Sequence, residues 1–581
     1  MLPLLWVSVA LVLSPSLLGG NILDALSTDD AMHLVEVRDL LNGQGWYDLV
    51  QHRGMPPDGI SIHWSRIIDI PLALIILATR PFVGQAGAEA LAMIAWPLTL
   101  LGAAMTLVCR IADKLAGPRA VVPALALSAL GVATLGHFRA GCIDHHGAQT
   151  VLMLGLALCA GQLDRHWRYP ALAGAMAAFS MAIGVEMIPI IVAVGLAVTL
   201  FAIWRGAAAA RGARILGLSL AGTAFVLFPL FVDVATLLRP VCDSFGGPVL
   251  LLAGGGGLGL AMIATVAARP ASTRALRLTV AAGIGALVAG AFALAFPECL
   301  RAPYGAVDPR IQTLWLDTVV ETLSFPRMVR NFPEECLAVF GYPLIAMVAA
   351  AIAWARSGKE RSLAWGIMLA ATAAHFCVSL WEIRGATAAA LSSAPLLGAA
   401  LAVLMPTVEA AYARRALVVA VLLSPLSLLS LGEAAKAAVD RIRAKPATQA
   451  AADARRCTGV RDVQPLAALP TGRVLSFIDL GPAILAETPH SIIAAPYHRN
   501  VAGNGAMLDV MLGSDAVARR VLTERAIDYV VICPSAAEQA NYAREAPQGL
   551  AARLVKGETP DFLVRLPLEG GNGLMAWRVV R

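Results

Sequence analysis

The chain has 581 residues, of which 58% are hydrophobic and only 14% are charged, and its mean hydropathy is +0.71. Soluble domains carry about 25% charged residues, so this composition excludes a water-soluble globular protein, a disordered chain, a disulfide scaffold and a coiled coil. The net charge of +6 does not indicate a nucleic-acid partner, because the basic residues are scattered over short segments between apolar runs. The sequence predicts an integral membrane protein.

The apolar stretches predict a polytopic α-helical protein. About thirteen of them approach the roughly 20 residues that a helix needs to cross a bilayer. The first, from Leu2 to about Leu18, has neither a basic start nor a small-residue cleavage motif, so we expect an anchor there. Residues 67–80 predict a re-entrant or surface helix. The other spans are expected near residues 86–109, 119–136, 148–163, 170–184, 187–203, 213–230, 247–268, 278–296, 337–355, 362–380, 386–404 and 416–432.

The loop charges predict the orientation of these spans. Arginine and lysine gather in every second loop, and the positive-inside rule makes those loops cytoplasmic. They contain Arg110, Lys114 and Arg119; Arg165 and Arg168; Arg205, Arg211 and Arg214; Arg269, Arg274 and Arg277; Arg356, Lys359 and Arg361; and Arg414 and Arg415. The loops expected on the outer side are 21–85, 137–147, 231–246, 297–336 and 381–385, together with the chain after about residue 433.

The end of the chain differs in composition from the rest. We expect a transmembrane domain over residues 1–433 and an outer α/β domain of ordinary charge density over residues 434–581. Runs beginning at Arg473 and Asp528 predict strands, and Asp515–Arg525 predicts a helix. An outer location permits disulfides.

Among the outer cysteines, Cys457 and Cys533 are the favoured pair, although buried unpaired thiols fit the sequence equally well.

Two clusters of polar residues stand out in the predicted outer loops. Asp29 and Asp30 follow the first span, where adjacent carboxylates suit a hard divalent cation; the spacing of Ser27 and Asp30 also fits a helix-capping box. In the next outer loop, Asp144 and His146 share one face of an extended chain and form half of a plausible metal site.

Glu321 and Arg384 are weaker signals, since a loop acid and an interfacial arginine are common. Arg384 has the geometry to hold a phosphate.

These motifs resemble those of the GT-C membrane glycosyltransferases, and most closely the catalytic subunit of oligosaccharyltransferase in its archaeal form. The matching segments are Asp29-Asp-Ala-Met-His33 with Arg38, then Pro57-Asp-Gly59 and Ile-His63-Trp64, then Asp144-His145-His146 preceded by Arg139 and Gly141, then Thr318-Val-Val-Glu321, and Phe477-Ile-Asp479-Leu-Gly481. The resemblance covers the whole chain and implies a helical GT-C domain with an outer C-terminal domain.

The resemblance also implies a reaction, in which a sugar or glycan passes from a polyprenyl-(pyro)phosphate to an acceptor on the outer face, with inversion at the anomeric carbon. It makes Asp29, Asp144 and His146 the ligands of Mg²⁺ or Mn²⁺, with Asp30 as an alternative ligand or a residue that holds the ligands in place. Asp29, Asp30 and Glu321 are the expected catalytic residues. Glu321 completes the site when its loop closes. Arg384 and Arg139 are the expected ligands of the lipid phosphate.

The acceptor side departs from the family. Phe477 and Ile478 stand where the family has tryptophans that help to bind the acceptor sequon, and neither can donate an indole N–H; Asp479 is retained. Since each lost hydrogen bond costs roughly 1–3 kcal/mol, the acceptor need not be a sequon asparagine. It is a protein, lipid or polysaccharide.

Two other functions fit the sequence less well. One is a transferase that uses a polyprenyl-monophosphate sugar to modify a lipid, polysaccharide or protein hydroxyl. The other is a transporter or flippase of lipid-linked sugars, which predicts mid-span charges and a repeat that the sequence lacks. The Ala-, Gly- and Arg-rich usage indicates a high-GC bacterium, hence an inner membrane with the site facing the periplasm.

Overall fold

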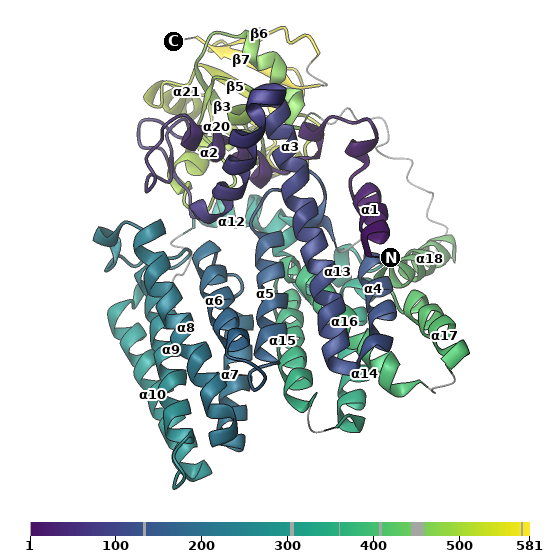
Figure 1. The fold of residues 1–581 in the computed structure, drawn as a ribbon. Helices are drawn as coiled ribbons and strands as arrows, with labels where there is room; N and C mark the ends of the chain where they lie inside the picture. Colours follow the sequence, from purple (N-terminus) through teal and green to yellow (C-terminus); the bar gives the residue numbers. More distant parts are fainter. Residues whose placement is uncertain are drawn as a thin grey trace.

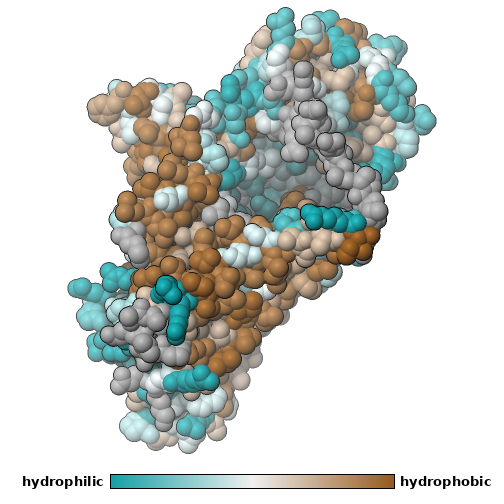
Figure 2. Space-filling view, turned by 90° about the vertical axis from the view of Figure 1, so that its right-hand side faces the viewer, coloured by the Kyte–Doolittle hydropathy of each residue, from teal (hydrophilic) through white to brown (hydrophobic). Residues whose placement is uncertain are grey.

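The computed structural model consists of a bundle of long helices and a smaller domain that contains a five-stranded sheet (Figure 1). It describes residues 2–131, 135–301, 307–358, 361–405, 409–442, 457, 459–570 and 573–580. Hydrophobic side chains cover the helical part and hydrophilic ones the smaller domain, with a hollow between them (Figure 2). The predicted fold class, a helical membrane protein with a C-terminal α/β domain, is confirmed; the predicted outer location of that domain, which we call the outer domain, stays a prediction.

Within the described residues, eight helices are long and apolar enough to cross a membrane, or nine if one bent pair counts as a single span. The eight are α3 (Arg66–Ala116), α7 (Ile188–Arg205), α8 (Ala207–Phe231), α9 (Gly247–Ala267), α10 (Arg274–Ala295), Leu337–Arg356 containing α14 (Tyr342–Arg356), α15 (Ser362–Trp381) and Ile383–Leu404 containing α16 (Ala386–Leu404). No side chain of α10 is buried, as expected of a helix that faces lipid.

The predicted count of about thirteen spans is not confirmed. Helices α1 (Leu2–Leu13), α4 (Val121–Ala129), α5 (His146–Ala160) and α6 (Arg168–Ile183) are shorter than the roughly 20 residues that a span requires. Helix α4 ends at Ala129, before the predicted end of its span at residue 136, and residues 132–134 lie outside the described residues.

Residues 67–80 are not a separate re-entrant helix. They form the first part of α3, which continues through the predicted span 86–109 and reaches from the bundle to the outer domain (Figure 1). The two parts meet at a kink at Gly84, whose φ of 73° lies in the left-handed region that glycine adopts without strain. A hydrophobic pattern interrupted by Arg80, Pro81 and Gly84 does not distinguish a kinked helix from two helices.

The predicted last span, 416–432, is bent. Helices α17 (Glu409–Leu422) and α18 (Pro425–Ile442) meet at an angle of 44°. Pro425 begins α18, where the missing backbone N–H of proline is tolerated. Helix α18 continues past residue 433, so the boundary between the predicted domains falls inside a helix. Residues 443–456 lie outside the described residues.

The outer domain is built on a mixed sheet with strand order β4-β3-β5-β7-β6. Strands β4, β3 and β5 are parallel, whereas β5–β7 and β7–β6 are antiparallel. The elements are β3 (Arg473–Leu475), α19 (Gly481–Glu487), β4 (Ser491–Ile492), α20 (Val501–Leu512), α21 (Asp515–Glu524), β5 (Tyr529–Ile532), α22 (Ala537–Glu545), α23 (Leu550–Val555), β6 (Leu563–Leu566) and β7 (Met575–Val579). The two strands and the helix predicted here are confirmed.

Two disulfides are present among the described residues. Cys457 pairs with Cys533, as predicted, and Cys242 pairs with Cys299, which connects the segment after α8 to the short helix α11 (Glu298–Arg301). Beside the second disulfide, the Asp243 carboxylate accepts hydrogen bonds from Arg499 of the outer domain.

The first outer loop is part of the same folded unit as the C-terminal domain. It contains α2 (Thr28–Leu41) and a hairpin of β1 (Val50–Gln51) and β2 (Ile60–Ser61). The hairpin connection joins the edge of the sheet, because Met55 donates its backbone N–H to Ile492 and Ile492 donates to Arg53. Ala31, Met32 and Trp64 are buried in one core with the apolar side chains of the outer domain. Residues near the start of the chain thereby complete the core of its last domain.

Replacing Arg53 by alanine is expected to destabilise this junction. The Arg53 guanidinium donates to the backbone carbonyls of Leu485 and Thr488, at 2.7 and 2.9 Å. Carbonyls that lose these donors cost about 1–3 kcal/mol, so Tm in thermal unfolding of the detergent-solubilised protein should fall by several degrees. Arg461→Ala is the control, because its ion pair with Asp24 is exposed and worth less than about 1 kcal/mol. Equal losses in the two variants would contradict the docking role of Arg53.

Candidate donor and metal site

The start of α2 determines how Asp30 and Asp29 are used. The Ser27 hydroxyl accepts a hydrogen bond from the Asp30 backbone N–H, and the Asp30 carboxylate accepts from the Ser27 backbone N–H at 2.9 Å, which forms a capping box. The other Asp30 carboxylate oxygen accepts from the backbone N–H groups of Ile143 and Asp144, at 2.7 and 3.2 Å. Asp30 is a buried positioning residue whose oxygens are occupied, so the predicted catalytic use of Asp30 is not supported.

The loop before α5 is held beside α2 by close backbone contacts. Gly141 has a φ of +95°, and a Cβ there would lie 2.9 Å from the Cβ of Ala25. Arg139 donates to the Ala25 carbonyl and approaches Asp30 to 3.8 Å. Arg139 therefore fixes the loop in place, a different use from the predicted binding of a lipid phosphate.

Asp29, Asp144 and Glu321 converge from three separate segments. Asp29 lies in the first turn of α2, Asp144 directly before α5, and Glu321 in the short helix Val320–Thr322. Burial raises the pKa of Asp29 well above its ordinary value, and the charges of Glu321, Asp144 and Asp30 raise it further. In the part of the chain that the structure describes, the Asp29 carboxylate makes no hydrogen bond. This concentration of negative charge favours a divalent cation.

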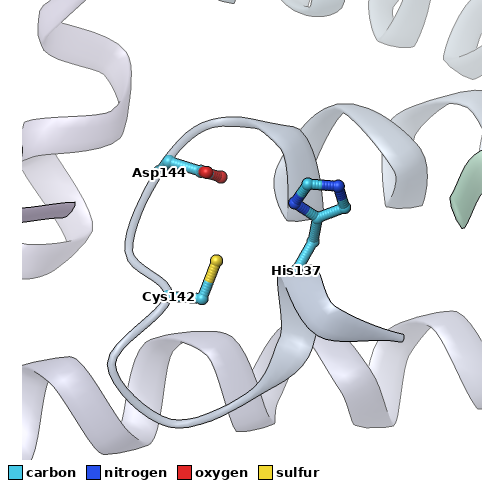
Figure 3. Close-up of side chains that lie close together, drawn as sticks. All are labelled: His137, Cys142 and Asp144. Carbon is cyan, nitrogen blue, oxygen red and sulfur yellow. The ribbon is translucent and has the colours of Figure 1, made fainter. Parts of the chain in front are cut away.

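Histidines surround Asp144. The ring centroids of His145 and His146 are 4.2 Å apart, and those of His137 and His146 are 5.0 Å apart. The ligand atoms of His137, Cys142 and Asp144 lie within 4.8 Å of one another, and the three side chains point toward a common space (Figure 3). Burial and the Asp144 charge raise the pKa of the Cys142 thiol. A thiol that keeps its proton is a poor ligand for Mg²⁺ or Mn²⁺, which prefer oxygen.

His145 pairs with an acid that the sequence analysis does not identify. Its Nε2 lies 3.2 Å from Glu186, which also accepts a hydrogen bond from Gln149 at 3.1 Å. Burial alone would lower the pKa of His145, but Glu186 raises it above the ordinary value. Glu186 occupies a two-residue turn between the predicted spans 170–184 and 187–203, and its charge at that depth was the available signal. The contributions of His137 and Cys142 were also missed.

Glu321 and Arg384 belong to neighbouring segments. The backbone N–H of Ile383 donates to the Leu323 carbonyl at 3.0 Å, which connects the Glu321 segment to the turn that holds Arg384. The Arg384 guanidinium lies 2.8 Å from Glu382 and remains partly exposed. A phosphate in this region would therefore compete with one carboxylate for Arg384.

The three predicted acceptor residues differ in burial. Phe477 and Ile478, which follow β3, are buried in the core of the outer domain. Asp479 is exposed and accepts a hydrogen bond from the indole N–H of Trp315 at 2.8 Å. An indole donor thus reaches this position from the loop 297–336.

Comparisons with known proteins support one fold. No protein-family model matches the sequence, and no curated protein matches it significantly. Among solved structures, the chain is similar to the oligosaccharyltransferase of Archaeoglobus fulgidus in its apo form, with a TM-score of 0.67, 14% identity, and coverage of 95% of this chain and 71% of that one. The chain has the GT-C fold of an oligosaccharyltransferase. The predicted resemblance is confirmed at the level of fold.

Two further structures of that enzyme give similar matches. A complex with an inhibitory peptide and a dolichol-phosphate has a TM-score of 0.64 at 16% identity, covering 95% of this chain and 70% of that one. A complex with Zn and sulfate has a TM-score of 0.61 at 15% identity, with coverage of 95% and 69%.

The pH dependence of stability tests whether the buried Glu538, which lies next to Asp479, keeps its proton in the folded state. Burial and the nearby Asp479 raise the pKa of Glu538 to about 8, and Glu538 accepts hydrogen bonds from the backbone of Ile478 and Asp479. The folded state holds this proton more tightly than the unfolded chain, so stability is greatest below the ordinary glutamate pKa and falls as pH rises through about 8. We expect Tm to decrease from pH 6 to pH 9.

Glu538→Gln should flatten this decrease, whereas Glu545→Gln, at an exposed position on the same helix, should leave it unchanged. An unaltered slope in Glu538→Gln would show that Glu538 is already ionised at neutral pH.

Proposed function

We propose that the protein is a glycosyltransferase that moves a sugar or glycan from a polyprenyl-phosphate or pyrophosphate donor to an acceptor on the outer face of the membrane. The observation that carries the proposal is the convergence of Asp29, Asp144 and Glu321 beside several histidines, at the junction of the helical bundle and the outer domain. The oligosaccharyltransferase fold, solved elsewhere with a dolichol-phosphate, supports the donor class.

Asp29, Asp144 and His146 are the proposed ligands of a divalent metal, Mg²⁺ or Mn²⁺. Asp29 offers a carboxylate that makes no hydrogen bond among the described residues, and Asp144 keeps one oxygen free because the other accepts from the His146 backbone at 3.0 Å. Hard oxygen ligands with one imidazole fit these ions. When bound, the metal would supply Lewis-acid stabilisation of the negative charge that develops on the leaving phosphate.

The other residues orient the donor and the acceptor. Arg384 would bind a phosphate oxygen of the lipid through a charge-assisted hydrogen bond, releasing Glu382. Glu321 would approach the acceptor as its loop closes, in the manner of a lid. The acceptor nucleophile attacks the anomeric carbon opposite the phosphate, a new glycosidic bond forms, and the phosphate departs with the bonding electrons, which inverts the configuration.

The buried positions of Phe477 and Ile478 favour an acceptor other than a sequon asparagine. Because these side chains lie in the core, the acceptor-facing group on this side is the exposed Asp479 carboxylate, which the buried Trp315 indole holds through a hydrogen bond. A hydroxyl that donates to Asp479 fits this arrangement. We place the site on the periplasmic side of a bacterial inner membrane, on the basis of the loop charges.

Asp29→Asn and Asp144→Asn should each lower the rate of transfer by at least about 100-fold. Each substitution removes a proposed ligand of the cation, which would stabilise the transition state by several kcal/mol. In a strain that lacks the gene, the lipid-linked donor should accumulate. Mass spectrometry of lipid extracts should show that wild type clears the donor and that neither variant does.

Asp24→Asn is the matched control, since Asp24 lies in the same predicted loop but is exposed and pairs with Arg461 of the C-terminal domain. Clearance by Asp29→Asn and Asp144→Asn at the wild-type rate, with all proteins present in the membrane in equal amounts, would refute the site. The accumulated lipid also identifies the donor as a monophosphate or a pyrophosphate.

Substitutions of Arg384 and Arg139 should have different effects, the first on KM and the second on Tm. Arg384→Gln removes a cation with partial solvent exposure near Glu321, so KM for the lipid-linked donor should rise about tenfold while Tm stays constant. Arg139→Gln should instead lower Tm, because Arg139 supports the Ala25 and Asp30 contacts. The reverse pattern would assign the phosphate to Arg139.

A further inference from the structure

A second group of metal-ligating side chains lies outside the site described above. His33 and Glu36 are one helical turn apart on α2, and Asp69 projects from the first turn of α3. The Nδ1 atom of His33 is 3.6 Å from a Glu36 carboxylate oxygen and 4.0 Å from a carboxylate oxygen of Asp69. All three ligand atoms lie within 4.8 Å of one another.

His33 is the residue that requires an explanation. It is completely buried, with 0% exposure, yet neither of its ring nitrogens has a hydrogen-bond partner among the described residues. A buried polar group without a partner costs about 1–3 kcal/mol, and native proteins nearly always satisfy such groups. Both carboxylates beside His33 are also buried. The distances from their oxygens to the His33 Nδ1 atom are too long for hydrogen bonds, but they are close to the separation of two ligands bound to the same metal ion.

The residues around His33, Glu36 and Asp69 fix the orientation of these side chains. His33 stacks on Trp64 with a centroid separation of 4.1 Å, which fixes the plane of the imidazole. Arg66 donates to one oxygen of Asp69 at 2.9 Å, and the other oxygen is the one nearer His33. Hydrogen bonds of this kind to ligating carboxylates are typical of metal sites.

The charges also favour a cation. Glu36 and Asp69 bring two carboxylates into a buried space, and Arg66 balances only one of them when the imidazole is neutral. Zinc–nitrogen and zinc–oxygen bonds of about 2.0–2.2 Å place the ligands of a tetrahedral ion about 3.3 Å apart. The two separations from the His33 Nδ1 atom exceed this by less than an ångström, which small side-chain rotations would close.

We propose that His33, Glu36 and Asp69 form a second, structural metal site for Zn²⁺ or a similar first-row divalent ion. One nitrogen and two carboxylate oxygens are the ligand set, and the ion would bind α2 to α3 below the turn that carries Asp29. The site is independent of the proposed function, because none of its ligands touches the donor or acceptor groups named above. Its role is to hold the helix on which Asp29 is placed.

The test is the zinc content of the full-length protein. Tag-free protein in detergent is loaded with Zn²⁺ alone, freed of loose ions by desalting, and measured by elemental mass spectrometry. Wild type should retain about one equivalent more than Glu36→Gln, and Zn²⁺ should raise Tm of wild type more than that of Glu36→Gln. Equal zinc contents would overturn the proposal and leave His33 in a plain ion pair with the two acids.

Glu89→Gln is the matched control. Glu89 is a buried α3 carboxylate that pairs with Arg38 of α2 at 2.7 Å, so this variant removes a charge between the same two helices but no proposed ligand. It should retain as much zinc as wild type. If it loses zinc as Glu36→Gln does, the effect is a loosening of the helices and the site is refuted.

A second measurement does not depend on whether Glu36→Gln folds. Asp144→Asn removes the first site, and the side-chain amide oxygen that this substitution introduces can still accept from the His146 backbone, which keeps the loop in place. X-ray absorption of zinc in this variant should show only nitrogen and oxygen neighbours at about 2.0–2.2 Å. A sulfur neighbour at about 2.3 Å would assign the ion to Cys142, and either that result or the absence of bound zinc would overturn the second site.

Discussion

The arrangement of the site depends on the buried carboxylate of Asp30. One oxygen caps α2, and the other accepts the backbone N–H groups of Ile143 and Asp144 from a loop more than a hundred residues away in the sequence. A charge without solvent is tolerated only when its lone pairs are filled by donors, and here the donors belong to the segments that must meet. Through these hydrogen bonds Asp30 brings the start of α2, which carries Asp29, next to the segment that carries Asp144.

A second constraint is the core shared by the first outer loop and the C-terminal domain. Burial of Ala31, Met32 and Trp64 among the side chains of the outer sheet connects α2 to the last part of the chain. Loss of that burial would release the helix that holds both Asp29 and the His33 group. The apolar contacts that stabilise the outer domain therefore also hold α2, and with it the candidate site residues, in place.

A local motif can be predicted from sequence: the spacing of Ser27 and Asp30 predicts the capping box that begins α2. Asp29 and Asp144 stand out in their loops, and their use as metal ligands stays a prediction. Glu186 was missed because it lies in a turn too short to be read as a loop, and its partner His145 is 41 residues away. Phe477 and Ile478 were placed by alignment to a family motif, whereas their burial follows from the path of the chain after β3.

By itself, the sequence determined the membrane character of the protein, the separation of an outer α/β domain and the family of folds, because these follow from composition, hydropathy and short motifs. Tertiary structure decided which acids keep free oxygens, which arginine fixes a loop and which remains partly exposed, and where apolar segments form one kinked helix. Those properties depend on hydrogen bonds and burial between distant residues such as Asp30 and Ile143 or His33 and Asp69. A local pattern carries no information about partners brought together only by folding.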